Sequence, residues 1–422
     1  MKNLLIVSCF LATSVILSTC SKDNEQGNNY PDPIKINLSA TELKMANENQ
    51  SFAFNLFSVV HELQADEENI ALSPLSLNMA LAMAWNGAKG ETKQKIKEAM
   101  GMGNYPQSEV NKYFQKLREA FIKTDPTVKL AIANSIWSRQ GFPVKTGFYD
   151  INRKYYDAEV KEVDFASPNT LKLINQWCSD NTNGLIKEIL KKIPDNARMY
   201  LLNALYFKGE WSDKFGFDTS ATRDANFKKE DGSLINVKMM SQNNTLPYYH
   251  DEKLSTTALP FGNNAFSMVF ILPNETVSFR ALLNQLKQPG YFEKCTQLRD
   301  KKEVDLYLPK FKIENEIKLV EILKQLGMGI AFSPDFADFS DISDIPLYIS
   351  DVRQKTSVSI DEKGGEAAAV TVIEFGVTSV GPPSPQKVVF RADRPFMFAI
   401  RENSTGVILF MGKIGGPNNL DE

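Results

Sequence analysis

Groups that commonly carry catalysis are scarce in this 422-residue chain, and this limits the chemistry it can perform. Only two histidines occur, His61 and His250, and neither lies in a Gly-x-Ser-x-Gly or His-Glu-x-x-His motif. A serine or zinc hydrolase needs a base or metal ligands at defined spacing, and Gly-rich phosphate-binding loops are missing as well. Both histidines are therefore expected to be surface or structural residues. We predict a protein that is not an enzyme, with no metal site and no cofactor.

A different kind of chemistry is indicated near the C-terminal end, in residues 355–389. A strand-like run at 355–360 leads through two glycines into small and then β-branched residues, and then into the Gly- and Pro-rich residues 376–385. With the two-residue period of a strand, one face carries Gly365, Ala367, Ala369, Thr371 and Ile373. The small and β-branched residues favour a central strand, whereas the glycines and prolines favour an exposed loop. The segment is a candidate switch; the competing interpretation of its alanines is a helical turn.

This segment and its surroundings resemble the hinge and reactive loop of the serpins, a family of suicide protease inhibitors. Further stretches that resemble the family follow in the family's order along the chain. They lie at residues 69–76, 86–92, 133–137, 174–177, 182–184, 202–211, 306–311, 390–396 and 409–413. The resemblance implies an α+β serpin fold with three mixed β-sheets, about eight or nine helices and an exposed reactive-centre loop at about residues 362–389.

The elements that must position this loop follow from hydrophobic periodicity. Apolar residues from Phe52 to Leu63 recur at helical spacing, residues 76–85 predict a buried helix, and Thr92 is expected to cap the next one. Strand-like runs follow at residues 128–137, 199–207, 266–272 and 304–308, with a hairpin at 395–400 and 407–411. Helices that cluster early and strands that cluster late predict the α+β class. Because no break in composition divides the chain, one large domain is favoured over two or three.

The N-terminal residues predict an exported lipoprotein. Lys2, an apolar stretch at 4–16 and small residues before Cys20 indicate a lipoprotein signal peptide at 1–19, with signal cleavage elsewhere as the alternative. Cys20 would carry the lipid, residues 20–39 would form a flexible tether, and residues 40–418 would form the serpin domain. The acidic residues after Cys20 resemble an export signal of Bacteroidetes-like bacteria, although a solvated linker would explain them too. We therefore expect a bacterial lipoprotein of the outer membrane, exposed on the cell surface.

Charge and cysteine content limit the expected partners. With 48 basic and 51 acidic residues, the chain has no excess of positive charge, so no nucleic-acid partner is predicted. Beyond the leader only Cys178 and Cys295 remain, and we expect buried thiols, with a disulfide between them as the alternative. The expected partners are target proteases, held in a covalent complex, and a membrane reached through the lipid on Cys20. The protein is expected to be a monomer.

The family resemblance assigns roles to residues at the start of the loop. The hinge would comprise Glu362, Gly364, Gly365, Glu366, Ala367, Ala368 and Ala369. The two glycines would allow the chain to bend, and the alanines would let the first residues enter a sheet without steric block. In the family, a bulky or charged residue at the position of Gly365 signals loss of inhibition, and glycine is permissive there. An ordinary turn is the competing interpretation of the glycine pair.

A second set of residues would control the opening of the central sheet. It comprises Lys310, Trp211, Ser73, Ser76, Asn203 and Gln354. Glu362 resembles an acidic residue at the sheet's opening, and Lys310 its salt-bridge partner. The polar residues of this set match a group beneath the sheet's centre, where the family usually carries a histidine in place of Gln354. Glutamine can still hydrogen-bond, but it does not titrate, so the pH response of this group should differ.

Target specificity depends on the residue before the cleaved bond. By the family's spacing, counted from Glu362, this bond joins Thr378 to Ser379. The segment that follows is longer than the common pattern, so the bond could instead follow Phe375, Val377 or Val380. A small or β-branched residue there predicts elastase-like, subtilisin-like or broad cysteine proteases. Trypsin-like enzymes are not expected, because no Lys or Arg lies between residues 363 and 387.

The resemblance therefore implies a suicide-substrate inhibitor. Cleavage of the exposed loop would leave a covalent acyl-enzyme, and insertion of the loop into the central sheet would trap the protease. A non-inhibitory member of the same fold, acting as a binding or storage protein, is one alternative; a surface lipoprotein for nutrient capture or adhesion is another. A hydrolase is disfavoured by the scarcity of bases.

Overall fold

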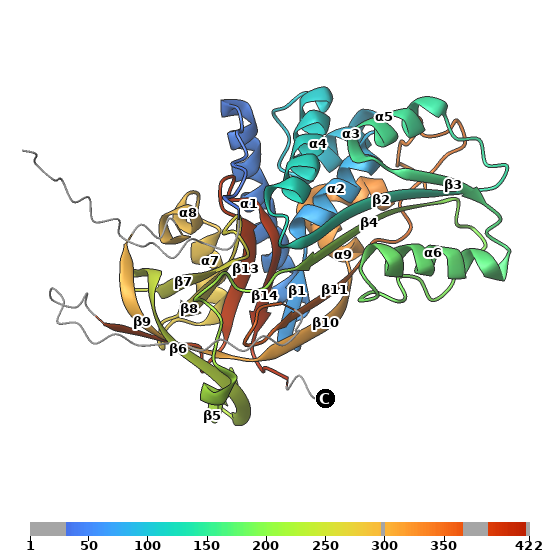
Figure 1. Ribbon diagram of the computed structural model, residues 1–422. Coiled ribbons are helices and arrows are strands. Elements are labelled where there is room, and N and C mark those ends of the chain that lie inside the picture. The colour runs from blue at the N-terminus through green and yellow to red at the C-terminus, as the bar shows by residue number, and fades with distance from the viewer. Residues whose placement is uncertain (1–30, 297–299, 366–386, 419–422) are drawn as a thin grey trace, which may run out of the picture.

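Helices dominate the first half of the chain, coloured blue to green in Figure 1. The computed structural model describes residues 31–296, 300–365 and 387–418. Within these ranges the α-helices are α1 (Ala40–Leu63), α2 (Pro74–Trp85), α3 (Gly90–Ala99), α4 (Gln107–Thr124), α5 (Thr146–Tyr156), α6 (Pro168–Asn181), α7 (Phe279–Leu286), α8 (Tyr291–Thr296) and α9 (Val320–Leu323). Shorter helical segments are η1 (Thr219–Ala221), η2 (Lys324–Met328) and η3 (Gly329–Phe332). None of the helices in the described ranges combines the length and the apolar character that crossing a bilayer would need.

The first two helices begin at side-chain caps that the sequence supplies. At α1, Ser39 Oγ accepts a hydrogen bond from Glu42 N–H at 3.2 Å, and Glu42 Oε2 accepts one from Ser39 N–H at 2.7 Å, which is a capping box. At α2, Ser73 caps the helix and Pro74 occupies its first turn. Helix α2 is buried on nearly all sides, as its apolar sequence predicts.

Most strands belong to one large twisted sheet. In the described ranges its order is β1-β14-β13-β8-β7-β6-β9-β12, and β5 pairs with β6 beside this path. The strands are β1 (Asn69–Leu72), β5 (Arg223–Lys228), β6 (Leu234–His250), β7 (Leu254–Phe261), β8 (Phe266–Pro273), β9 (Lys301–Pro309), β12 (Val388–Arg391), β13 (Phe396–Glu402) and β14 (Ile408–Ile414). The predicted C-terminal hairpin is β13–β14, and both of its strands lie in the core.

Two smaller sheets complete the architecture. One has the order β3-β2-β4, formed by β3 (Glu159–Val163), β2 (Lys129–Arg139) and β4 (Met199–Lys208). The other is the pair β10 (Phe311–Lys318) and β11 (Arg353–Ile360). The predicted strands at 128–137, 199–207 and 355–360 correspond to β2, β4 and β11, with ends that differ by one or two residues.

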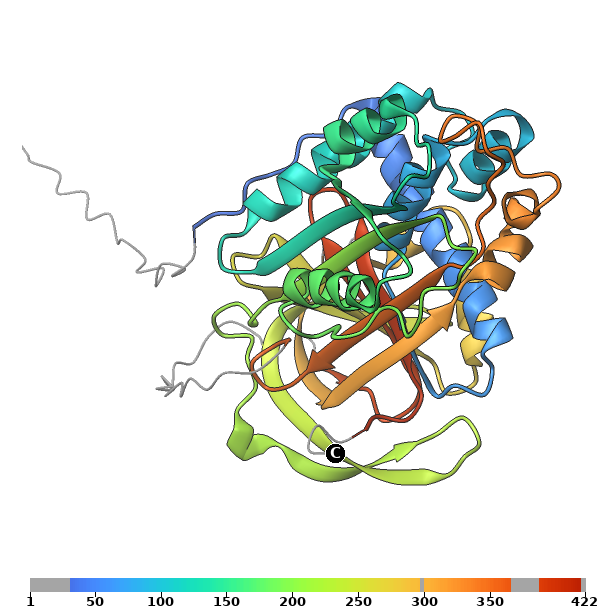
Figure 2. The same ribbon diagram turned by 90° about the vertical axis from the view of Figure 1, so that its right-hand side faces the viewer.

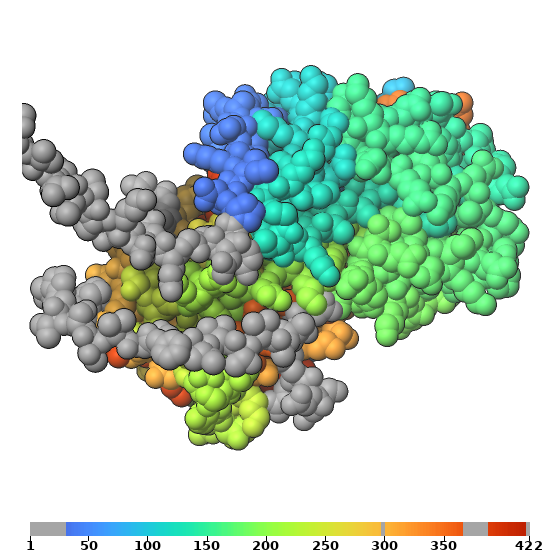
Figure 3. Space-filling model, in the orientation of Figure 1, coloured from blue at the N-terminus to red at the C-terminus, as the bar shows by residue number. Residues whose placement is uncertain are grey.

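Two hydrophobic cores lie on opposite faces of the sheet that contains β2 and β4. The larger core includes α2, which contacts β4 and β14. The smaller core packs α6 onto β2 and β4 through Trp137, Ile174, Trp177 and Ala204. Figure 2 shows α6, in green, lying across the outer face of these strands. On the surface, the blue-to-green first half of the chain covers the upper right of the face in Figure 3.

Two local expectations from sequence differ from the structure. Thr92 does not cap α3: it lies inside the first turn, and its Oγ1 accepts a hydrogen bond from Asp338 N–H at 2.9 Å. The sequence suggested that Thr92 would bond within its own helix, whereas in the structure it bonds to a residue far away in the chain. Contacts with the folded body also begin at Ile34, before the predicted domain start at residue 40, because Ile34 N–H donates to Thr124 O at 3.3 Å.

Candidate functional site

The two small sheets present inner edges that are not paired with each other. Strand β4 is hydrogen-bonded to β2, and β11 is hydrogen-bonded to β10, in both cases along the whole strand. Among the residues that the structure describes, no ladder joins β4 to β11. Interior strands normally pair on both sides, since unpaired backbone groups are costly when water is excluded. The edges of β4 and β11 therefore mark an incomplete sheet, and we call the space between them the gap.

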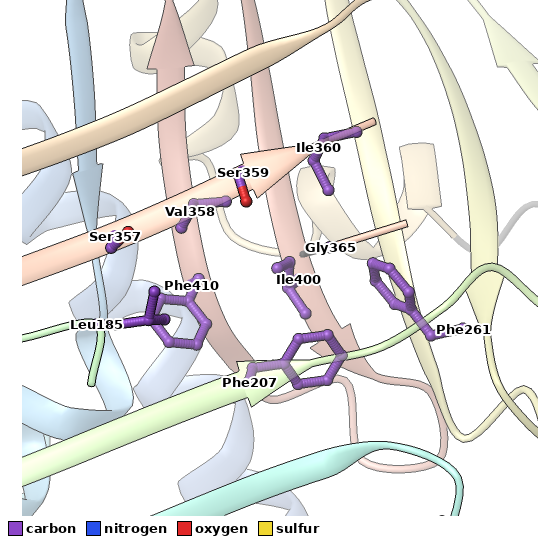
Figure 4. A pocket seen from close by; sticks show the side chains of 10 residues that line it. All are labelled: Leu185, Phe207, Phe261, Ser357, Val358, Ser359, Ile360, Gly365, Ile400 and Phe410. Atoms are coloured by element: carbon purple, nitrogen blue, oxygen red, sulfur yellow. The ribbon is translucent and has the colours of Figure 1, made fainter. Parts of the chain in front are cut away.

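The gap has an apolar floor. Figure 4 shows its lining, in which Phe207 of β4 and Val358 of β11 come from opposite edges, while Ile400 and Phe410 come from the large sheet behind. Leu185, from the connection between α6 and β4, lies at the same place. The side chains of β11 keep the two-residue alternation of burial that its sequence predicts. A floor of this kind is suited to the buried face of one more strand.

A tight turn at residues 361–364 closes one end of the gap. Asp361 Oδ1 accepts hydrogen bonds from Lys363 N–H at 2.8 Å and from Gly364 N–H at 3.2 Å. Gly364 has a φ of +133°, and a Cβ atom there would lie 2.4 Å from the carbonyl oxygen of Gly209. Both the backbone conformation and the close approach require glycine at this position.

The turn is bonded to the residues that follow β4. Trp211 N–H donates to Lys363 O at 2.7 Å, and Gly365 N–H donates to Gly209 O at 2.9 Å. These bonds place Gly364 opposite Glu210 as an antiparallel bridge. The ends of β4 and β11 are thus tied together at the hinge, although the described strands are not joined further along.

Trp211 supports this turn from the core side. Its side chain is buried and stacks on Phe261, with 4.6 Å between ring centroids and 13° between the ring planes. Its indole Nε1 donates to the carbonyl oxygen of Asp361 at 3.2 Å. A core aromatic residue therefore also carries a hydrogen bond that fixes the first residue of the turn.

The two hinge glycines are not equivalent. A Cβ atom added at Gly365 would lie 3.5 Å from the carbonyl oxygen of Ser359 and 3.8 Å from that of Gly209, which is ordinary van der Waals contact. The native arrangement therefore has room for a small side chain at Gly365, whereas it has none at Gly364. Any need for glycine at residue 365 must arise from another state of the chain.

The pKa values of two adjacent carboxyl groups at the turn are shifted in opposite directions. Burial alone would raise the pKa of Glu362, but its hydrogen bonds, including one from Thr222 Oγ1 at 2.8 Å, and the ammonium of Lys310 at 3.1 Å outweigh burial, so its pKa is lowered. Burial raises the pKa of Asp361, and the charge of Glu362 adds to the effect. The Lys310–Glu362 ion pair joins the start of β10 to the hinge, and the Glu362 side chain is only 8% exposed.

Gln354 and Ser73 form a bonded pair beneath β11. Gln354 Oε1 accepts from Ser73 N–H at 2.8 Å, and Gln354 Nε2 donates to Ser73 O at 2.9 Å. Ser73 Oγ donates to Leu409 O at 2.6 Å and accepts from Ser76 N–H at 3.2 Å. Strand β11 is thereby linked to the start of α2 and to β14 by a group that carries no titratable side chain.

Asn203 does not join that group. It lies opposite Asn134 on β2 and donates through Nδ2 to Asn134 Oδ1 at 2.7 Å, while Asn134 Nδ2 donates to Tyr156 O at 2.7 Å. The predicted cluster is therefore divided into one part on each side of the gap. Asn203 Oδ1 and Thr356 Oγ1 of β11 are both buried and have no hydrogen-bond partner among the residues that the structure describes. Each strand bordering the gap thus carries an unsatisfied polar atom.

Several predicted site residues lie outside the described residues. They are Glu366, Ala367, Ala368 and Ala369 of the hinge, Thr378 and Ser379 at the reactive bond, the alternatives Phe375, Val377 and Val380, and the lipidation site Cys20. Their roles remain predictions from sequence.

The structure adds three residues that the sequence interpretation missed. Asp361 builds the hinge turn, Thr222 binds Glu362, and Asn134 holds Asn203. For Asp361 a signal was present, because an Asp three residues before a Gly is typical of a turn closed by its side chain. Nothing near Thr222 or Asn134 in the sequence points to their distant partners.

No metal centre or reactive thiol marks the described part of the chain. Within it, no group of three or more His, Cys, Asp and Glu side chains is placed to hold a metal ion. Cys178 and Cys295 are both free and buried, as expected, so the alternative of a disulfide between them is wrong. Burial raises the pKa of each thiol to about 12.

Comparison with known proteins gives one consistent result. A family model described as Serpin (serine protease inhibitor) matches residues 47–417. An uncharacterized serpin-like protein of Thermococcus kodakarensis is 32% identical over 90% of this chain and 87% of its own length. The leukocyte elastase inhibitor of Equus caballus is 32% identical over 89% of this chain and 100% of its own length.

Solved structures agree with these sequence relatives. The thermophilic serpin tengpin in its native state superposes with a TM-score of 0.79 at 33% identity, covering 92% of this chain and 99% of tengpin. Thyroxine-binding globulin in complex with thyroxine superposes with a TM-score of 0.78 at 29% identity, covering 89% of this chain and 100% of the globulin. The second neighbour binds a small molecule, so likeness of fold alone does not determine activity.

Proposed function

This chain belongs to the serpin family, and we propose that it inhibits proteases as a suicide substrate. The predicted serpin fold is confirmed by the family match and by the solved relatives. Relatives that inhibit proteases include the elastase inhibitor of Equus caballus. Three features of this chain support inhibition over simple binding: the incomplete sheet, the hinge at the end where β4 and β11 are tied together, and the small residues that follow it in the sequence.

In the proposed reaction, the target protease supplies the chemistry. Its nucleophile attacks the carbonyl carbon of the residue before the cleaved bond, an ester or thioester forms, and the new amino terminus leaves with a proton. The freed segment then enters the gap as a central strand, with the acylated protease attached to its end. About 14 residues at ~3.3 Å each would carry the protease some ~45 Å. A misplacement of even ~1 Å can cost ~100-fold in rate, so hydrolysis of the acyl group would stall.

The observation that carries this proposal is the register that the hinge fixes. The bridge of Gly364 with Glu210 and the bond of Gly365 to Gly209 start an antiparallel strand against β4. Continued along this register, Ala367 would lie between Phe207 and Val358. Thr371 would lie between Asn203 and Gln354, where its hydroxyl group could donate to the unsatisfied Asn203 Oδ1. The face of small residues in the sequence would therefore match the floor of the gap.

We infer a target with a preference for small or β-branched residues. The bond between Thr378 and Ser379 is the proposed site, with cleavage after Phe375, Val377 or Val380 as alternatives. Elastase-like, subtilisin-like and broad cysteine proteases accept such residues.

Incubation with pancreatic elastase or subtilisin tests the inhibitor proposal. We expect a covalent complex that survives boiling in detergent, together with a released C-terminal fragment whose mass identifies the cleaved bond. Complete cleavage without a complex would contradict inhibition and would favour a non-inhibitory member of the fold. Resistance to every protease of these classes would contradict the proposed loop chemistry.

We propose further that the protein is an exported lipoprotein anchored by a lipid on Cys20, in the outer membrane and facing the cell exterior. Support comes from the leader sequence and the acidic residues after the cysteine. Labelling of expressing bacteria with a palmitate analogue should mark the protein, and the label should vanish in Cys20→Ala. Cys9→Ala is the matched control within the leader and should keep the label. A label that persists in Cys20→Ala would refute this anchor.

A further inference from the structure

The segment before the first helix is fastened to the folded body at two points. We call residues 34–39 the N-terminal strap. Ile34 N–H donates to Thr124 O at 3.3 Å, and Thr124 Oγ1 donates back to Ile34 O at 2.6 Å. Ile36 N–H donates to Ser404 Oγ at 3.1 Å, and the Ile36 side chain is buried in the main core at 7% exposure. The strap then enters α1 through the Ser39 capping box.

The two fastening points lead to one turn, residues 261–265, between β7 and β8. Thr124 O, which holds the strap, also accepts from Asn263 Nδ2 at 3.0 Å. The neighbouring Asp125 Oδ2 accepts from Asn263 N–H at 3.0 Å. On the other side, Asn403, which precedes Ser404, donates through its N–H to Ala265 O at 2.8 Å. Thr124 O thus binds both the strap and the turn, while Ser404 and Asn403, which bind one each, are neighbours in the chain.

The 261–265 turn supports the hinge. Phe261 stacks on Trp211, and Gly262 N–H donates to Glu210 O at 2.9 Å. Trp211 in turn bonds the hinge through Asp361 O and Lys363 O. Gly262 has a φ of +46°, and a Cβ there would lie 2.5 Å from Asp125 Oδ2, so the turn has no freedom to shift toward α4. Each step from the strap to the hinge is a direct contact or a link between neighbours in the chain, and some of these residues, such as Asn403 and Ser404, are exposed.

We propose that the N-terminal strap is a brace that restrains the hinge and so slows entry of the following segment into the gap. The inference rests on the proposed inhibitory function, since it names a regulator of the same conformational change. If the strap were released, Thr124 and Ser404 would lose the bonds that hold them to it, the 261–265 turn would rest on less firmly fixed neighbours, and the Trp211 contact with the hinge would open more often. A pull on the tether, or proteolysis within it, would then act on the hinge without any contact between the two.

A chain of contacts by itself does not show coupling, so the test must measure coupling directly. Hydrogen exchange of the full-length protein, read by mass spectrometry on peptides that cover residues 209–217 and 361–365, reports the opening of the hinge. In Ile36→Ala, which removes the buried anchor of the strap, these peptides should exchange about tenfold faster or more, equivalent to a loss of ~1.4 kcal/mol in the closed state. Ile34→Ala is the matched control, because the Ile34 side chain is 63% exposed and its backbone bonds would remain.

A second pair of measurements keeps a local effect apart from a general loss of stability. Peptides from β9 and β12, at the far edge of the large sheet, should exchange at the wild-type rate in Ile36→Ala. Ser404→Ala, which removes the acceptor for Ile36 N–H, should speed hinge exchange in the same direction by a smaller factor. Equal acceleration at all peptides, or no acceleration at the hinge in either variant, would overturn the proposal.

The effect of the strap variants on protease inhibition is measured in a separate experiment. In the strap variants, intact protein should convert during incubation to a form that no longer inhibits, several times faster than wild type. If the wild type itself forms no covalent complex, the proposed function fails, whatever the exchange data show. If the wild type inhibits but the variants convert at its rate, only the brace is refuted.

Discussion

The C-terminal hairpin and the strands bordering the gap show two opposite ways of placing a strand inside a protein. In the hairpin, β13 pairs with β14 on one side and β8 on the other, and β14 pairs with β13 and β1. Strands β4 and β11 also contribute to the core but are less completely buried, and each is paired along one side in the described residues. The hairpin strands are paired on both sides, whereas no ladder between described strands joins β4 to β11 across the gap.

The difference indicates where this fold can hold unused free energy. Backbone hydrogen bonds each contribute about 1 kcal/mol net, and a buried polar atom without a partner costs about 1 to 3 kcal/mol. Asn203 Oδ1 and Thr356 Oγ1 at the gap add to the unpaired edges. A strand entering the gap would remove both deficits at once. Strands that are paired on both sides, such as β13 and β14, stabilise the fold despite this local lack of hydrogen bonds.

Filling the gap should produce the largest effect. If a protease that is not itself retained nicks the chain within residues 366–386, the freed segment should enter the gap and form about ten new backbone hydrogen bonds. At about 1 kcal/mol each, these would add roughly 10 kcal/mol to the free energy of unfolding. For a domain of this size, that corresponds to a rise of about 10 °C in the unfolding temperature. Differential scanning calorimetry before and after nicking measures it; superimposable curves would show that the gap stores nothing.

Blocking the start of insertion should come next in magnitude. Gly365→Arg should fold, since a Cβ at this position meets only ordinary van der Waals contacts, and it should be cleaved at the wild-type rate. Residue 365 lies beside Gly209 already, and insertion of the residues that follow it would confine the arginine against the apolar floor, where burial of an unpaired charge is strongly unfavourable. Cleavage should therefore yield no covalent complex and no rise in unfolding temperature. Gly365→Ala is the control and should still inhibit; a trapped complex with Gly365→Arg would remove the hinge from the mechanism.

The fold could be anticipated because its elements carry strong local patterns. Strand β11 alternates along its length, and α2 is apolar on every side, so both were found within a residue or two. The separation between β4 and β11 could not be anticipated from these strands. Hydrophobic alternation specifies the faces of a strand but does not say whether its edges are paired.

The site was predictable where a residue type has one main use. Gly364 has a positive φ and a backbone contact that only glycine tolerates, and Lys310 and Glu362 carry opposite charges. The structure brings this charged pair together, although they lie far apart in the chain. The partners of Asn203 were assigned to the wrong group, because an amide can bond to almost any neighbour. The strap was missed because the polar and Pro-containing residues just before it are typical of a linker, and residues 34–39 were assigned to the same tether.

The ion pair at the hinge should give a smaller, pH-dependent effect. Glu362→Gln should lower the free energy of unfolding by about 1 to 2 kcal/mol at pH 7, because a partly buried charged hydrogen bond is lost. The folded-state pKa of Glu362 is lowered, so its contribution is present above the ordinary value of 4.5 and is lost as the pH falls through the folded-state value. Chemical unfolding of both proteins from pH 3 to pH 7 should therefore show curves that converge at acid pH.

The contribution of the neighbouring carboxyl group, Asp361, to stability changes with pH in the opposite sense, so Asp361 is kept in both proteins. Asp361 has a raised pKa, so its contribution is greatest at low pH and falls as the pH rises above 3.8. It is present in both proteins, so the part of its shift that burial causes cancels in their difference, whereas the part caused by the charge of Glu362 is lost in Glu362→Gln. Glu314→Gln on β10 is the control, because Glu314 pairs with Lys312 where both side chains are exposed, and it should change stability little. A pH-independent difference for Glu362→Gln would show that the ion pair does not carry the effect.

The smallest expected effect on stability comes from removing a single threonine hydroxyl, either at the gap or in the large sheet. Thr356 on β11 and Thr257 on β7 are both buried, but Thr257 Oγ1 donates to Pro247 O at 2.9 Å, whereas Thr356 Oγ1 has no partner. Thr257→Val should therefore lower the free energy of unfolding by about 1 kcal/mol, since it removes a hydrogen bond to a partly buried carbonyl. Thr356→Val removes an unsatisfied group and should raise it by a similar amount. Urea unfolding of both variants measures the sign of each change in the free energy of unfolding. Equal destabilisation would mean that the Thr356 hydroxyl is satisfied in solution, and that β11 borders a gap no more deficient in hydrogen bonds than the large sheet.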